Sequence, residues 1–178
     1  MIVRKLLGAA LALAAGAVAV TAAPAATAYQ PGLSAASARL LAAHNRERAR
    51  VGAPALQWDP QLAASAASYG PALARIGRLQ HSPKGSRPGQ RENLWMGTRG
   101  AFSPEQMVGS WVAERAYFRP GVFPNVSRTG NWMDVSHYTQ LIWPTTTRVG
   151  CAIHTQGGWD YLICRYSPPG NRDGRPVP

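Results

Sequence analysis

The chain has 178 residues, of which 46% are hydrophobic and 15% charged, and this length and composition suit a single folded domain. Its 19 basic and 8 acidic side chains give a formal net charge of +11. The basic residues are scattered along the chain, without zinc-ligand sets or a recognition-helix pattern, which argues against a nucleic-acid-binding module.

Residues 1–28 have the pattern of a secretory signal peptide. Arg4 and Lys5 precede an apolar run over residues 6–20, and small side chains up to Ala28 suit a cleavage site. The alternative is an uncleaved anchor, but this run is shorter than the roughly 20 residues that a membrane span needs. Cleavage would leave a mature chain with 17 basic and 8 acidic side chains, so its formal charge would be +9. We therefore expect a secreted protein, extracellular or periplasmic.

The exported part divides into a short leader at residues 29–33, a folded domain at residues 34–175 and a tail at residues 176–178. Apolar residues at helical spacing predict a first helix over residues 34–51. His44 lies on the apolar face of this helix. Such a histidine is either a hydrogen-bonded core residue or a metal ligand, and the first is the commoner case.

Asp59 and Pro60 are typical of the start of a second helix, because aspartate caps helices and proline fits the first turn. The helix has one apolar face, formed by Leu62, Ala66, Tyr69, Leu73 and Ile76. Pro71 interrupts this pattern. Because an interior proline removes one hydrogen bond and clashes with the preceding turn, we expect a kink or break near residues 69–70.

A short strand is predicted over residues 92–96, and a third helix begins at Ser103 and Pro104 with a capping-box glutamine. The buried face of this helix is formed by Met107, Trp111 and Phe118. Glu114 shares that face. A carboxylate on an apolar face needs a polar partner, so Glu114 is a candidate site residue.

Residues 119–132 are rich in proline and glycine and predict an irregular loop. Beyond the loop, Asp134 or Ser136 is expected to cap a short helix that carries His137.

A β-hairpin follows, with strands over residues 148–155 and 159–166. Gly157 and Gly158 predict a two-residue turn with positive φ at both positions. This turn pairs residues whose numbers sum to 315, so Cys151 faces Cys164 in a non-hydrogen-bonded pair, where Cα atoms are closest. We expect a cross-strand disulfide, and the alternative is two buried free thiols.

Residues 136–143 (SHYTQLIW) and 163–171 (ICRYSPPGN) resemble the two signature motifs of the CAP superfamily. This superfamily is named for cysteine-rich secretory proteins, insect antigen 5 and plant pathogenesis-related class 1 proteins. The resemblance covers residues 34–175. It differs in having Ser136 where the family usually has glycine, in fewer cysteines and in a longer gap between His81 and Glu92. It implies an α+β fold, a three-layer α-β-α sandwich with a small antiparallel sheet between helices.

The resemblance also implies a cleft that gathers His81, Glu92, Glu114 and His137, which match the two histidines and two acidic residues of the family. Their chemistry leaves three alternatives. His81 and His137 could bind Zn²⁺ or another divalent cation weakly, with the glutamates orienting them. Each glutamate could instead pair with a histidine in a structural network. Hydrolysis is the third alternative, but no third zinc ligand or oriented nucleophile is visible.

Three functions follow from these features. The leading hypothesis is a secreted, monomeric, non-enzymatic protein that binds a small apolar ligand such as a sterol, fatty acid or other lipid. The resemblance places its ligand loop at residues 117–132, where the aromatic residues are Tyr117, Phe118, Phe123 and Trp132; the same loop could be ordinary filler. The second is a metal-dependent hydrolase of peptide or cell-wall substrates that uses the cleft. The third is adhesion to acidic polymers or an anionic membrane surface through the basic surface.

Overall fold

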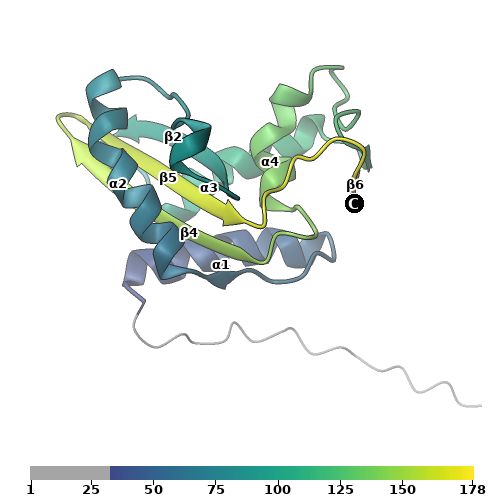
Figure 1. The fold of residues 1–178 in the computed structure, drawn as a ribbon, viewed down its shortest axis with the longest axis horizontal. Helices are drawn as coiled ribbons and strands as arrows, with labels where there is room; N and C mark the ends of the chain where they lie inside the picture. The colour runs from purple at the N-terminus through teal and green to yellow at the C-terminus, as the bar shows by residue number, and fades with distance from the viewer. Residues whose placement is uncertain (1–32) are drawn as a thin grey trace, which may run out of the picture.

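The computed structural model describes residues 33–178, and the predicted signal peptide lies outside the described residues. Figure 1 shows a mixed sheet between helices on its two faces, which confirms the predicted three-layer α-β-α fold. The sheet order is β1-β4-β5-β2. Its strands are β1 (Gln57–Trp58), β2 (Arg91–Thr98), β4 (Arg148–Gln156) and β5 (Trp159–Ser167). Only β1 and β4 run parallel; the other pairs are antiparallel.

Helix α2 (Pro60–Ile76) packs on β4 and β5 on one face of the sheet. Helices α1 (Ala35–Arg50), α3 (Pro104–Ala113) and α4 (Ser136–Leu141) lie on the other face. Two hydrophobic cores result, because alternate residues of a strand point to opposite faces. The smaller core, under α2, contains Ala66, Leu73, Leu94, Tyr161 and Ile163. The larger contains both cysteines and the apolar faces of the other three helices.

The first two helices start where the sequence predicts. The Ser34 hydroxyl accepts a hydrogen bond from the Ser37 amide, and Asp59 accepts two from the first turn of α2. The break expected at Pro71 is wrong, since α2 continues through it to Ile76. The residue before proline normally resists the helical conformation because its Cβ clashes with the ring, and here that residue is Gly70.

The predicted hairpin register is confirmed, with Gln156 opposite Trp159 and Cys151 opposite Cys164. The two cysteines form the expected disulfide, with Cα atoms 4.1 Å apart. The turn differs in one detail, because the left-handed φ occurs at Gly157 alone and not at both glycines. A primed turn of this kind also has two central residues, so the register is unchanged.

The region between α3 and α4 is more ordered than the expected loop. It contains the 3₁₀ turns η2 (Glu114–Tyr117) and η3 (Trp132–Val135) and the short strand β3 (Gly121–Val122). Strand β3 pairs with β6 (Pro176–Val177), formed by residues that the sequence analysis sets apart as a tail. A further 3₁₀ turn, η1 (Lys84–Ser86), lies in the loop before β2.

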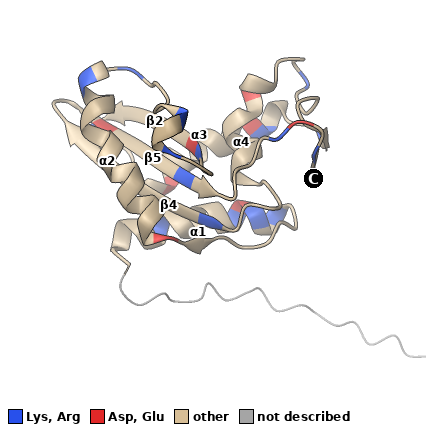
Figure 2. Cartoon of the chain, viewed as in Figure 1, with Lys and Arg blue, Asp and Glu red and all other residues tan. Residues whose placement is uncertain are grey.

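Among the described residues, no helix has the length and apolar character that a membrane crossing requires. Basic residues lie on α1, α2, β4, β5 and the C-terminal segment, as Figure 2 shows, and the acidic ones are fewer.

Candidate functional site

A cleft of about 470 Å³ opens beside the start of β2 and the start of α4. Three of the four predicted site residues, His81, Glu92 and His137, line it. The remaining lining is polar or basic apart from one aromatic residue, and consists of Ser82, Lys84, Arg87, Arg91, Asn93, Trp132, Ser136, Gln140 and Asn171. Glu114 does not line the cleft itself but forms a hydrogen bond with His137, which does.

On one side of the cleft, His81 is paired with Glu92. The Nδ1 atom of His81 donates a 2.8 Å hydrogen bond to Oε1 of Glu92, and the histidine side chain is 55% exposed. The Ser82 amide donates a 3.0 Å hydrogen bond to Oε1 of Glu92, and the Ser82 hydroxyl donates one of 3.0 Å to Oε2. Glu92 is thus a fixed anchor beneath an accessible imidazole.

The Glu92 carboxylate is fully buried and is stabilised from the sheet by Arg165 of β5. The Nη2 atom of Arg165 lies 3.0 Å from Oε2 of Glu92. Burial acts to raise the pKa of Glu92, but the hydrogen bond from His81, the Arg165 charge and the Ser82 bonds outweigh it and lower the pKa. Glu92 is therefore ionised in the folded protein at neutral pH.

On the other side, His137 is paired with Glu114. Its Nδ1 atom donates a 2.5 Å hydrogen bond to Oε1 of Glu114. The second carboxylate oxygen accepts the backbone amides of His137 and Tyr138, both at 3.0 Å. The cap predicted at Asp134 or Ser136 is wrong, because Glu114, at the start of η2, satisfies the first amides of α4 from outside the helix.

Trp111 fixes the plane of the His137 ring. The two rings are stacked, with centroids 6.1 Å apart and an interplanar angle of 12°. The Trp111 indole is itself held by a 3.1 Å hydrogen bond from Nε1 to the Leu94 carbonyl. Helix α3 thus supplies both the stacking partner of His137 and, just beyond its end, the carboxylate.

The two histidines share one chemical arrangement. An ionised carboxylate can only accept hydrogen bonds, so each Nδ1 carries a proton, and in the neutral imidazole each Nε2 is then an acceptor. Such a carboxylate–histidine pair is the arrangement that orients imidazole for metal binding. Each of these two histidines could therefore offer its Nε2 atom to a divalent cation that accepts nitrogen ligands.

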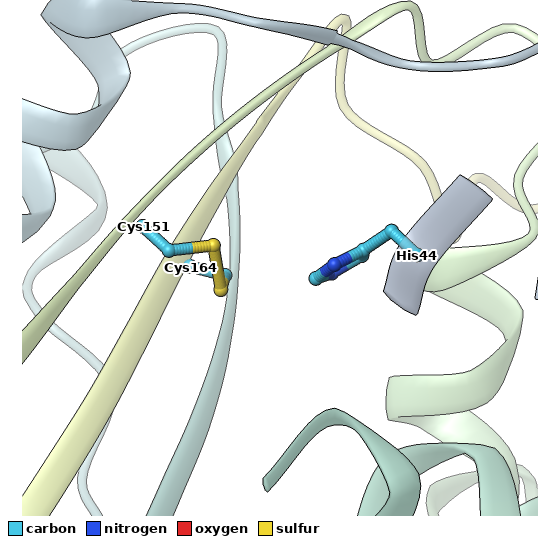
Figure 3. Close-up of side chains that lie close together, drawn as sticks. All are labelled: His44, Cys151 and Cys164. Atoms are coloured by element: carbon cyan, nitrogen blue, oxygen red, sulfur yellow. A yellow bond between two sulfur atoms is a disulfide. The ribbon is translucent and has the colours of Figure 1, made fainter. Parts of the chain in front are cut away.

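A different His/Cys group lies in the core, where ligand atoms of His44, Cys151 and Cys164 are within 4.8 Å of one another (Figure 3). The two sulfurs are joined in the disulfide and offer no thiolate. Both nitrogens of His44 are already hydrogen-bonded, to the Leu40 carbonyl and the Tyr166 hydroxyl, each at 2.8 Å. His44 is thus the hydrogen-bonded core residue that the sequence favours.

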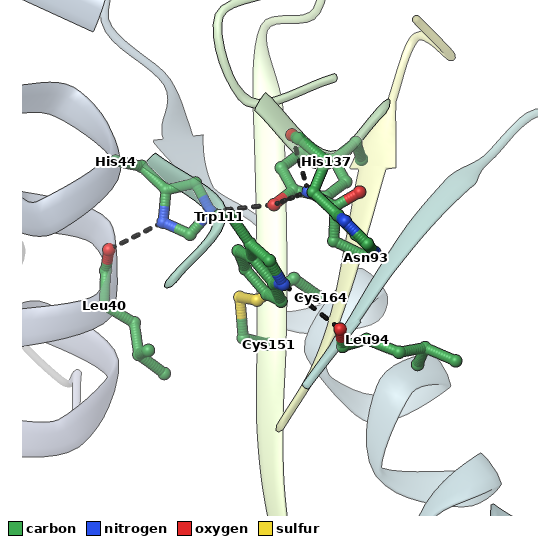
Figure 4. The surroundings of a disulfide bond; sticks show 9 residues. Leu40, His44, Asn93, Leu94, Trp111, His137, Cys151 and Cys164 are labelled. Atoms are coloured by element: carbon green, nitrogen blue, oxygen red, sulfur yellow. Dashed lines mark hydrogen bonds between the residues drawn. A yellow bond between two sulfur atoms is a disulfide. The ribbon is translucent and has the colours of Figure 1, made fainter. Parts of the chain in front are cut away.

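A buried chain of hydrogen bonds connects this core histidine to the cleft, as Figure 4 shows around the disulfide. The Tyr166 hydroxyl donates to Nε2 of His44 and accepts from the Asn93 amide at 3.3 Å. Asn93 also donates to the His137 carbonyl at 3.0 Å. The position of α4 is therefore linked through β2 and β5 to α1.

The second sequence motif packs directly on the first. Asn171 donates a 2.8 Å hydrogen bond to the Ser136 carbonyl and accepts one of 2.8 Å from the Thr139 hydroxyl. The Gly170 amide donates to Oε1 of Gln140 at 3.0 Å, and a Cβ at Gly170 would lie 2.6 Å from the Trp143 ring. These contacts hold α4 at the cleft and explain why the two motifs occur together.

The family model of the cysteine-rich secretory protein family, CAP, matches residues 41–166 of this chain. The chain belongs to the CAP family. Pathogenesis-related protein PR-1 type of Sambucus nigra is 35% identical over 134 residues, which cover 75% of this chain and 76% of that protein. Pathogenesis-related protein 1C of Nicotiana tabacum is 38% identical over 137 residues, which cover 76% of each.

Solved structures show the same fold. The crystal structure of NaASP2 with Zn²⁺ has a TM-score of 0.69 and 23% identity, and covers 83% of this chain and 87% of that one. Na-ASP-1 has a TM-score of 0.64 and 27% identity, and covers 77% of this chain and 39% of that one. The disulfide of this CAP domain suits a family described as secretory.

The four loop aromatics of this CAP domain have different environments. Phe118 and Phe123 are buried in the larger core, where Phe118 packs on Tyr138 and Phe123 on Trp143. Tyr117 is 53% exposed and Trp132 is 40% exposed. Trp132 is the one of the four that lines the cleft.

Sequence reasoning missed two groups of residues at this site. Arg165 supports Glu92 from the neighbouring strand, because β2 pairs with β5 and places Glu92 opposite Arg165; this pairing is not visible in the sequence. Lys84, Arg87 and Arg91 line the cleft as well. Their signal was the presence of three basic residues between His81 and Glu92.

Proposed function

We propose that this protein is an exported, non-enzymatic binding protein whose cleft holds a divalent metal ion weakly through Nε2 of His81 and of His137. The observation that carries this proposal is the matched pair of carboxylate–histidine hydrogen bonds, each of which fixes Nδ1 as the donor. Export is supported by the signal-like residues 1–28 and by the disulfide.

The carboxylates favour a binding role over hydrolysis. A hydrolytic cleft needs a general base with a free oxygen near the attacking water. Here both oxygens of Glu92 and both oxygens of Glu114 accept hydrogen bonds from protein groups. These glutamates therefore orient the histidines, and two histidine ligands leave the metal exchangeable.

Zinc binding is tested by isothermal titration calorimetry on the wild-type protein and on the variants His81→Ala, His137→Ala and His154→Ala. His154 is the matched control, since it lies on β4 and does not line the cleft. We expect one zinc ion per chain, with affinity reduced at least about tenfold in each cleft variant and unchanged in the control. Wild-type affinity in both cleft variants would refute the metal proposal.

The hydrolase alternative is tested with the same proteins. Zinc-loaded wild-type protein is incubated with peptide and cell-wall substrates, and product release is followed by mass spectrometry. The binding proposal expects no turnover that depends on His81 and His137. Turnover that disappears in the double variant His81→Ala/His137→Ala would make the protein a hydrolase.

A small apolar ligand is a second candidate, supported by exposed side chains in the segment between α3 and α4. Four large apolar residues of this segment are at least 40% exposed: Tyr117, Val122, Trp132 and Met133. The turns η2 and η3, which carry Tyr117 and Trp132, contact each other. Native mass spectrometry of the protein from its own host, before and after mild denaturation, would reveal a lipid bound here, and Tyr117→Ser/Met133→Ser should reduce its occupancy.

A further inference from the structure

A second hollow of about 420 Å³ adjoins the cleft and is lined mainly by the loop that precedes β2. Its lining consists of Lys84, Arg87, Pro88, Gly89, Gln90, Arg91, Pro169 and Arg172. Lys84, Arg87 and Arg91 line both hollows. We call the second hollow, with these three shared residues, the basic groove.

The charges of the basic groove are uncompensated. It has four cationic side chains and no acidic one, and Asp173, next to Arg172 in sequence, lines neither hollow. Within residues 33–178, none of the four cations forms a salt bridge. The cleft contributes one carboxylate, Glu92, which is buried and already paired with Arg165. The potential in the groove is therefore positive, and a concave surface concentrates it.

Two of the arginines are held in place by neutral groups. Arg87, which is 8% exposed, donates from Nε to the Ser82 carbonyl and from Nη1 to the Gln90 carbonyl. Arg91 donates from Nε to the Gly170 carbonyl and from Nη2 to the Asn171 carbonyl. Backbone carbonyls fix the guanidinium planes without neutralising them. An anion that binds beside such a largely buried guanidinium stabilises its charge. Because the arginine side chain is already held in place, it loses little rotamer freedom on binding.

The adjoining cleft offers groups that suit a sugar ring. Amide and hydroxyl side chains line it, namely Ser82, Asn93, Ser136, Gln140 and Asn171. Trp132 adds one aromatic ring, 40% exposed. Hydroxyl-rich ligands with one apolar face are recognised by such a mixture of amides and an aromatic ring. In the groove itself, the apolar lining is restricted to two prolines, so a lipid tail has no apolar pocket there.

We propose that this face binds a linear acidic oligosaccharide, with its carboxylate or sulfate groups on Lys84, Arg87, Arg91 and Arg172 and a sugar ring in the cleft beside Trp132. Guanidinium groups pair with carboxylate and sulfate oxygens in a bidentate manner, which favours such ligands over a simple point-charge attraction. The binding uses fixed charges of the chain and needs no metal, so it stands independently of the zinc proposal.

The proposal differs from general adhesion by a basic surface, because it localises binding to one groove. The test compares two double variants that remove equal charge, Lys84→Glu/Arg172→Glu in the groove and Arg46→Glu/Arg99→Glu outside it. All four side chains are exposed and form no hydrogen bond or salt bridge among the described residues, so neither variant removes a polar contact. The probes are a heparin-derived octasaccharide, a galacturonate octamer, neutral dextran and phosphatidylglycerol vesicles.

Binding is measured by isothermal titration calorimetry in chelator, over a series of salt concentrations. We expect at least one acidic octasaccharide to bind and dextran not to. The groove variant should lose at least about fivefold in affinity and show a smaller salt dependence, and the control should stay within about twofold. Tighter binding of the heparin-derived octasaccharide would indicate a preference for sulfate groups, and tighter binding of the galacturonate octamer a preference for carboxylates.

Three results would overturn the proposal. Equal losses in the two double variants would assign the attraction to the whole basic surface. Binding to the vesicles with no binding to either octasaccharide would make the partner a membrane. If the octasaccharides do not bind in chelator but bind once zinc is added, the metal and not the basic groove is the group that binds them.

Discussion

His44 makes the stability of this domain sensitive to mild acid. The imidazole is fully buried, and burial, aided by the nearby Arg48 charge and opposed by the hydrogen bond to Leu40, lowers its pKa from 6.5 to about 4. Below pH 6.5 the unfolded chain binds a proton at His44 that the folded protein does not. Stability is therefore lost as pH falls, at about 1.4 kcal/mol per pH unit, until the folded pKa is reached. Between about pH 7 and pH 4.5 the loss amounts to about 2.5 kcal/mol.

The assay is urea unfolding at these two pH values for wild-type protein, His44→Gln and the control His154→Gln. Glutamine at position 44 does not titrate, so the variant should be less stable at neutral pH but should lose about 2.5 kcal/mol less on acidification. The variant His154→Gln shows how the loss of another histidine side chain changes stability at the same two pH values. An identical loss in His44→Gln and wild-type protein would refute the conclusion that His44 remains neutral in the folded state.

Two further predictions concern the disulfide and the anchor of α4. Removing the disulfide with Cys151→Ala/Cys164→Ala opens a loop with a sequence separation of 13 and should lower the free energy of unfolding by about 3 kcal/mol. Urea unfolding with and without reductant measures it, and a change below about 1 kcal/mol would contradict it. Glu114→Gln should weaken zinc binding about tenfold and lower the free energy of unfolding by about 1–2 kcal/mol, because it removes the charged acceptor of His137 and of the first amides of α4. Glu105→Gln is its matched control for zinc affinity, because Glu105 pairs with Arg39 and does not line the cleft, and equal zinc affinities in the two variants would contradict the assigned role.

The hairpin and its disulfide could be predicted because their determinants are local. Two adjacent glycines set the turn, the turn sets the register, and the register places Cys151 opposite Cys164. The starts of α1, α2 and α3 were predictable for the same reason, since a capping side chain lies within three residues of the amide that it satisfies. Pro71 shows the limit of a single-residue rule, because α2 continues through it although an interior proline lacks one helical hydrogen bond, and Gly70 before it has no Cβ to meet the proline ring.

The cap of α4 could not be predicted from its own sequence. Asp134 stands at a suitable position, but its carboxylate accepts hydrogen bonds from Thr129 and Asn131 instead. The cap comes from Glu114, 23 residues away from His137, and only the packing of α3 beside α4 brings the two together. Arg48 is similar, since its guanidinium leaves α1 to donate to the carbonyls of Leu141 and Trp143.

The four cleft residues could be predicted from the sequence only because the chain resembles the CAP family. Periodicity marked Glu114 as a carboxylate on an apolar face, but it gave no partner for it. The resemblance supplied the set, and the structure supplies the pairing: His81 with Glu92 and His137 with Glu114. The pairing is what turns four titratable residues into two oriented ligands, because each carboxylate fixes one ring nitrogen and leaves the other available. By contrast, the basic groove is built mainly by the loop between His81 and Glu92, which lies outside the two signature motifs, so residues outside these motifs would set the choice of ligand.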